Sequence, residues 1–87
     1  MSFSSQALLN EAFKMTTDYL SKKTLGRDEE LQMLSCSYAN LFLLAASKAS
    51  MNELGSAHEL IAKCFERLGD TVWSEKHKVT AAGYFKL

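Results

Sequence analysis

Apolar residues recur along this chain with the spacing of α-helices. In the first segment, they return every three or four positions between residues 8 and 20 and form one wide apolar face. A serine at the start of this segment is a good N-cap, and Gly26 suits the left-handed residue that ends a helix. We therefore predict a first helix from Ser4 or Ser5 to Thr24.

The second segment is apolar on more than one side. Asp28, Glu29 and Glu30 place negative charge at the positive end of a helix dipole, so a helix should begin near Asp28. Its apolar residues are Leu31, Met33, Leu34, Cys36, Tyr38, Leu41, Phe42, Leu43, Leu44 and Ala45. Because such a helix is covered by more than one neighbour, we expect it at the centre of the fold or in an interface. It should run to Ala49.

Two capping signals lie after this helix. Residues 50–53 and residues 56–59 both fit the S-x-x-E capping box, and Gly55 lies between them. Of the two signals, the second is favoured. We expect a loop or irregular turn at 50–55 and a third helix that starts at Ser56.

Gly69 determines how the C-terminal part divides. The apolar stripe keeps its phase across this glycine, which favours one continuous helix from 56 to 73 with a close packing point at Gly69. A short last helix then covers about residues 78–86. In the alternative interpretation, the third helix ends at Leu68 and Asp70 caps a new helix.

Composition agrees with an all-helical fold. The 87 residues include no proline, which would break helix interiors, and no alternating β-branched run of the kind found in strands. We predict a single all-α domain over residues 1–87, a small bundle of three long helices plus a short C-terminal helix.

Charge and cysteine content argue against several functions. Five basic and five acidic residues lie in residues 1–50 and the same numbers in 51–87, so we expect no nucleic-acid partner. The longest apolar run, residues 41–46, is far shorter than the ~20 residues of a membrane span, so we expect no membrane insertion. Without a signal-peptide pattern, Cys36 and Cys64 are interpreted as reduced thiols of a cytoplasmic protein.

The sequence carries no motif of an enzyme. His58 and His77 lie on different predicted elements, without a histidine at i+4 that would complete a metal pair, and are interpreted as solvated or capping residues. Both cysteines are interpreted as small buried hydrophobes. Neither a glycine-rich phosphate loop nor a nucleophile elbow is present. We therefore expect no catalytic residues, no cofactor and no metal.

The C-terminal third carries two patterns that together mark a helical hairpin. The residues are Phe65, Leu68, Gly69 and Val72 in the first pattern and Ala81 and Phe85 in the second. At this spacing, residues 57–87 resemble one unit of the tetratricopeptide repeat, which folds as two antiparallel helices. Proteins of that family bind peptides in a groove lined by the first helices of their repeats.

The resemblance implies a partner-binding groove in this chain. By position, its lining residues are Lys63, Glu66, Asp70 and Trp73. Members that clamp a peptide carboxylate use lysines and asparagines there. Glu66 and Asp70 depart from that pattern, which argues against a carboxylate ligand.

These features predict a non-catalytic protein–protein interaction module, a helical adaptor or chaperone-like binder of a partner peptide or helix. The alternative is a small self-associating inhibitor or immunity-type protein that acts by binding its target, in which Met33, Leu43 and Leu44 join the C-terminal aromatic residues at a homodimer contact. These aromatic residues are Trp73, Tyr84 and Phe85, which either anchor a partner or close the last helix onto the core. A nucleic-acid-associated regulator is the least favoured alternative.

Overall fold

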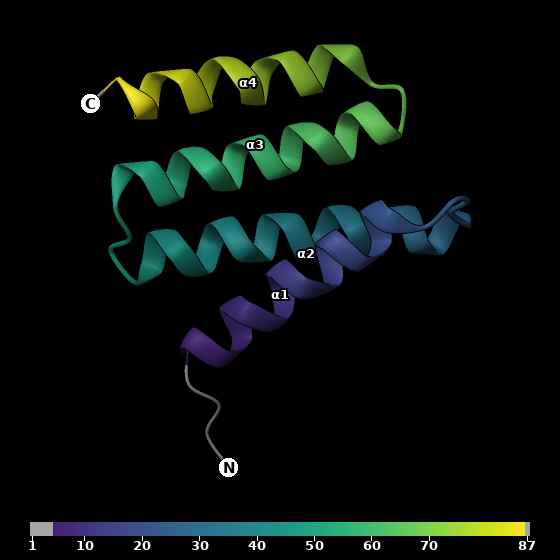
Figure 1. Ribbon diagram of the computed structural model, residues 1–87, viewed down its shortest axis with the longest axis horizontal. Coiled ribbons are helices and arrows are strands. Elements are labelled where there is room, and N and C mark those ends of the chain that lie inside the picture. The colour runs from purple at the N-terminus through teal and green to yellow at the C-terminus, as the bar shows by residue number, and fades with distance from the viewer. Residues whose placement is uncertain (1–4, 87) are drawn as a thin grey trace.

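The computed structural model describes residues 5–86, which form four helices joined by short turns (Figure 1). The helices are α1 (Ser5–Ser21), α2 (Arg27–Ala46), α3 (Met51–Arg67) and α4 (Thr71–Phe85). No strand occurs within residues 5–86, so the prediction of an all-α fold is confirmed for this part of the chain. The helices have 17, 20, 17 and 15 residues, and the last is the shortest.

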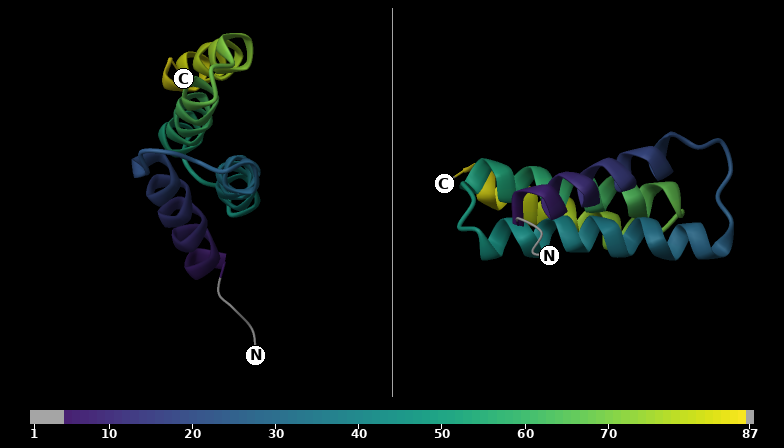
Figure 2. Two further views of the ribbon diagram at one scale, coloured as in Figure 1. Left: turned by 90° about the vertical axis from the view of Figure 1, so that its right-hand side faces the viewer. Right: turned by 90° about the horizontal axis from the view of Figure 1, so that it is seen from below.

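The central helix is α3. It lies between α4 on one side and α2 on the other, and its most extensive contact is with the antiparallel α4 (Figure 1). α1 packs along α2 but touches α3 only sparsely, and the left view in Figure 2 shows it diverging from α3. The principal extents are 38 × 33 × 15 Å, so the molecule is flat. This flat arrangement leaves much of each helix open to solvent.

The connections on either side of α2 correct the predicted helix limits. α1 ends at Ser21, three residues earlier than predicted. Gly26 has a φ of −73°, so it is not left-handed, and it precedes α2 as the N-cap. Its amide donates to Glu29 Oε1 at 3.0 Å, which satisfies a backbone donor at the helix start. α2 ends at Ala46, because Lys48 turns the chain with a left-handed φ of 57°.

The predicted start of the third helix at Ser56 is wrong, because the first capping signal is the one used. Ser50 Oγ accepts from the Glu53 amide and Glu53 Oε1 accepts from the Ser50 amide, both at 3.2 Å. Gly55 therefore lies inside α3. A Cβ at this position would be 2.7 Å from Cε1 of Phe85, so the glycine lets the end of α4 approach α3 closely.

The predicted continuous helix through Gly69 is also wrong, and the alternative interpretation is confirmed. Gly69 has a φ of +78°, and its amide and that of Asp70 donate back to the last turn of α3 in a Schellman motif. Asp70 then caps α4 by accepting from the Trp73 amide at 3.0 Å. The residues between Phe65 and Val72 that carry the tetratricopeptide resemblance therefore span two helices and the turn between them.

The core is thin and centred on α3. Its buried apolar residues are Ala12, Met33, Leu44, Ala57, Leu60, Ile61, Ala62, Cys64 and Ala81. Several large apolar side chains remain outside this core, among them Phe42, which is 70% exposed. Among residues 5–86, no helix is long and apolar enough to cross a membrane. The fold thus combines a small core with apolar surface that faces solvent.

Candidate functional site

An apolar groove lies between α1 and α3, above the C-terminal half of α2. Its volume is about 500 Å³ and it opens to solvent. The lining residues are Leu9, Asn10 and Phe13 of α1, Asn40 and Leu44 of α2, and Asn52, Glu53, Ser56, Ala57 and Leu60 of α3. We call this hollow and its continuation, described next, the α1–α3 groove.

The groove continues along both helices toward the α1–α2 connection. A second hollow shares Phe13, Ser56 and Leu60 with the first and is also lined by Leu20 and Lys63. Along α3 the two hollows together extend from residue 52 to residue 63. At a rise of 1.5 Å per residue, this corresponds to about 16 Å, or three helical turns.

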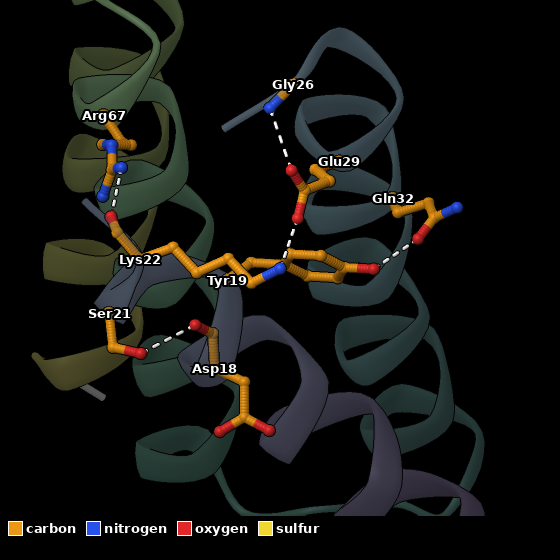
Figure 3. A network of polar contacts seen from close by, with 8 residues as sticks. All are labelled: Asp18, Tyr19, Ser21, Lys22, Gly26, Glu29, Gln32 and Arg67. Atoms are coloured by element: carbon orange, nitrogen blue, oxygen red, sulfur yellow. Dashed lines mark hydrogen bonds and ion pairs between the residues drawn. The ribbon is translucent and has the colours of Figure 1, made fainter. Parts of the chain in front are cut away.

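The groove is open because α1, which packs along α2, is tied to α3 at only one end. The Arg67 guanidinium of α3 donates to the carbonyl oxygen of Leu20 at 3.0 Å, at the end of α1. It also donates to the carbonyl oxygen of Lys22, just after α1 (Figure 3). The Lys22 side chain in turn forms an ion pair with Glu29 at the start of α2. These contacts tie the C-terminal end of α1 to both neighbours, while its N-terminal end diverges from α3 (Figure 1).

The walls and the floor of the groove differ in exposure. Phe13, on the α1 wall, is 51% exposed, although its position on the apolar face of α1 suggested a core residue. Leu44 and Leu60 lie deeper and are buried. The groove therefore offers one large aromatic side chain at its rim and aliphatic surface beneath it.

A second feature, on α2, α3 and α4, is a chain of polar aromatic side chains. The Nδ1 atoms of His58 and His77 are 2.9 Å apart, and His77 Nε2 is 2.7 Å from the Tyr38 hydroxyl. The ring of Phe65 stacks on His77 with a centroid distance of 5.8 Å. His77 is only 9% exposed, so its interpretation as a solvated or capping residue is wrong. The antiparallel turn at Gly69, which was the less favoured alternative in the sequence analysis, brings these two histidines together.

The short distance between the two histidines and their burial favour the neutral form of the imidazole rings. Two Nδ1 atoms at this distance share a single proton, so the two rings cannot both be charged. Burial lowers the pKa of His77, and the neighbouring His58 lowers it further. Burial also lowers the pKa of His58. Within residues 5–86, no three His, Cys, Asp or Glu side chains are grouped as the ligands of a metal ion would be.

The structure separates the four residues that the repeat resemblance placed in one groove. Lys63 lines the α1–α3 groove, and Asp70 caps α4. Glu66 forms an ion pair with Lys78, which holds the pKa of the Glu66 carboxyl below its usual range. Trp73 stacks on Phe65 next to His77, with a ring-centroid distance of 6.1 Å to Phe65.

The other predicted contact residues also lie at different places in the structure. Leu44 is on the floor of the α1–α3 groove, whereas Leu43 lines a shallow hollow between α1 and α2. At the C-terminal end, Tyr84 stacks on His58 and Phe85 covers Gly55. These two aromatic residues therefore pack the end of α4 onto α3.

Comparison with protein-family models, with curated proteins and with solved structures finds no match to this chain. Function is therefore inferred from the two features above. The α1–α3 groove combines aliphatic, aromatic and amide side chains, which is typical of a binding site. The histidine cluster is mostly covered by the aromatic rings around it and contributes to the packing of α4.

Proposed function

We propose that this protein is a non-catalytic protein–protein interaction module that holds an amphipathic helix of a partner in the α1–α3 groove. The observation that carries this proposal is an open apolar groove about three helical turns long, with Phe13 half-exposed at its rim. Grooves between helices commonly bind a helix through anchors at i, i+3 or i+4, and i+7. Three turns of groove provide room for such a set of anchors.

Other modes of peptide binding fit this groove less well. Strand addition requires the exposed edge of a sheet, and residues 5–86 contain no strand. Proline-rich peptides bind to grooves lined by several aromatic rings, whereas Phe13 is the single aromatic residue among the described residues of this lining. A helix with an apolar face matches the aliphatic floor better.

A selection from a displayed library of 16-residue helical peptides tests the proposal. Peptides enriched on the wild-type protein should bind through the groove, so Phe13→Asp should weaken them by about 10–100-fold, which corresponds to the burial of one large apolar side chain. Val79→Asp is the matched control, because Val79 is 65% exposed on α4 and lies outside the groove lining.

The two variants should remain folded, which far-UV circular dichroism checks. The proposal is wrong if no peptide is enriched, or if the enriched peptides bind Phe13→Asp and the wild type equally well. A loss of binding in Val79→Asp alone would place the binding surface on α4 and would also contradict the proposal.

The second candidate function is a self-associating inhibitor that acts by binding its target. It is favoured by apolar side chains exposed outside the groove, on the outer faces of α2 and α4. These are Leu31 and Phe42 on α2 and Val72 and Val79 on α4. Sedimentation analysis distinguishes the two candidates, because a 9.7 kDa monomer at high concentration contradicts self-association.

We further propose that the module works in a reducing compartment such as the cytoplasm. Cys36 and Cys64 are both free thiols in the structure, and burial raises the pKa of Cys64 to about 11. A thiol with such a pKa stays protonated and unreactive at neutral pH. Fractionation of the native cell, followed by immunodetection, tests this location.

A further inference from the structure

The floor of the α1–α3 groove holds a polar side chain that lacks a hydrogen bond. Asn40 is 3% exposed and lines the groove, yet its side-chain amide has no hydrogen-bond partner among the residues that the structure describes. An amide can donate two hydrogen bonds and accept two. Asn40 is therefore a nearly buried polar group whose hydrogen-bonding capacity is not used by the protein itself.

The other buried polar side chains differ from Asn40. The hydroxyls of Thr16 and Ser37 each donate to a carbonyl of their own helix at 2.8 Å. Ser74 donates to Glu66, and His77 contacts Tyr38 and His58. Buried polar groups in folded proteins are normally paired in this way, because an unpaired one destabilises the fold.

The unused amide of Asn40 is directed into the groove. Within residues 5–86, no side-chain nitrogen or oxygen is both sealed from solvent and without a partner. The polar atoms of Asn40 must therefore retain contact with open space, and the open space next to this residue is the groove that it lines. A helix that filled the groove would remove this last access to water.

Such a helix must replace the lost water with a hydrogen bond of its own. We propose that Asn40 selects the partner of this protein: an amphipathic helix with one amide or hydroxyl side chain, placed opposite Asn40, in an otherwise apolar stripe. This inference rests on the proposed function of the groove. A buried asparagine in a helical interface has the same effect elsewhere, since it favours one register at a cost in affinity.

The charges along the α3 rim indicate the direction of the partner. Glu53 lines the first hollow of the groove, and Glu59 and then Lys63 follow in the second hollow. A complementary helix carries basic residues beside the two glutamates and an acidic residue beside Lys63. The rim charges thus define the orientation of the partner helix, and Asn40 defines the position of the one polar residue in its apolar stripe.

Parallel selections on two proteins test the inference. The displayed library has 16-residue helices whose apolar-stripe positions are randomised, and it is selected on the wild type and on Asn40→Leu. Wild-type pools should retain Asn, Gln, Ser or Thr at one stripe position, while Asn40→Leu pools should have an apolar residue there. Replacing that polar residue by leucine should weaken binding to the wild type about tenfold and should not weaken binding to Asn40→Leu.

The outcomes separate the inference from the proposed function. If both pools share a fully apolar stripe and still depend on Phe13, the groove binds helices but Asn40 does not select them, and the inference falls alone. If neither pool is enriched, both proposals fall. Asn40→Leu should fold, because it removes an unpaired amide, and Asn40→Ala serves as a second variant with the same expected loss of selectivity.

Discussion

The same glycine-to-alanine substitution should have opposite effects at two positions of this chain. Gly69 has a φ of +78° in the turn between α3 and α4, whereas Gly83 lies inside α4 on its exposed side. A Cβ added at either position would meet no atom within 4 Å, so neither substitution creates a clash or a new contact. The difference between the two variants therefore measures backbone conformation alone.

The expected magnitudes follow from this geometry. An L-residue in the left-handed region costs about 1–2 kcal/mol, and the lower entropy of the unfolded alanine variant offsets about 0.4–1 kcal/mol of this cost. Gly69→Ala should therefore lower the free energy of unfolding by about 1 kcal/mol. Gly83→Ala should raise it by about 0.5–1 kcal/mol, with the lower value favoured because Gly83 is in the last turn of α4.

The assay is urea unfolding followed by far-UV circular dichroism. The two alanine variants should differ by about 1.5–2 kcal/mol, which is about 10 °C in melting temperature for a domain of this size. Gly69→Asn should be more stable than Gly69→Ala, because asparagine tolerates the left-handed conformation better. A Gly69→Ala variant at least as stable as the wild type would refute the left-handed turn and restore the continuous helix.

Three further predictions concern packing, pH and thiol reactivity. Gly55→Ala should destabilise the protein by up to about 2 kcal/mol, because overpacking against Phe85 costs about 1–3 kcal/mol while the helix propensity of alanine offsets about 1 kcal/mol. In a Phe85→Ala background the same substitution should stabilise the protein, and additive effects in the double-mutant cycle would contradict the close contact. Because burial lowers the pKa of the paired histidines, the unfolded state binds more protons than the folded state below the ordinary value of 6.5. The urea midpoint should therefore be constant just above that pH and fall below it, and His77→Gln should reduce this slope; an unchanged slope would exclude the histidine pair as its cause. Iodoacetamide should alkylate the partly exposed Cys36 before the buried Cys64, whose pKa is raised to about 11. Mass spectrometry of timed samples measures the order of alkylation, and the reverse order would contradict the packing of α2 against α3.

The helices were predicted best where their signals are local. The first turn of α2, with three acidic residues, was expected one residue after its observed start at Arg27. The capping box at Ser50 and the N-cap at Asp70 were both recognised, because each requires only residues three positions apart. The choice between competing signals failed at Gly55 and Gly69, where the sequence alone offered two consistent interpretations.

Tertiary contacts decided both choices. A glycine lies inside α3 at position 55 because Phe85, thirty residues later, packs against its backbone and leaves no room for a side chain. Gly69 could end α3 because α4 folds back along α3 and buries Ala81 and His77 against it. The apolar stripe that suggested a continuous helix instead continues from one helix onto the next.

The candidate site was the part that the sequence described least. Phe13 belonged to a predicted apolar face, but periodicity identifies the face of a helix and not the neighbour that covers it. Asn40 carried no sequence signal, because a single asparagine in a helix is polar surface unless another helix buries it. The predicted contact residue Leu44 does lie on the floor of the groove, although it was chosen for self-association.

The sequence by itself determined that the chain is helical and where capping residues allow its helices to begin, because helix propensity and capping act within a few residues. Only the tertiary structure decided that α1 diverges from α3 and leaves a groove between them. That angle depends on contacts between distant residues, above all the bonds from Arg67 to the end of α1, forty-seven and forty-five positions earlier. The same long-range packing placed His58 beside His77 and buried Asn40 without a partner, so both features arise from the fold and not from local pattern.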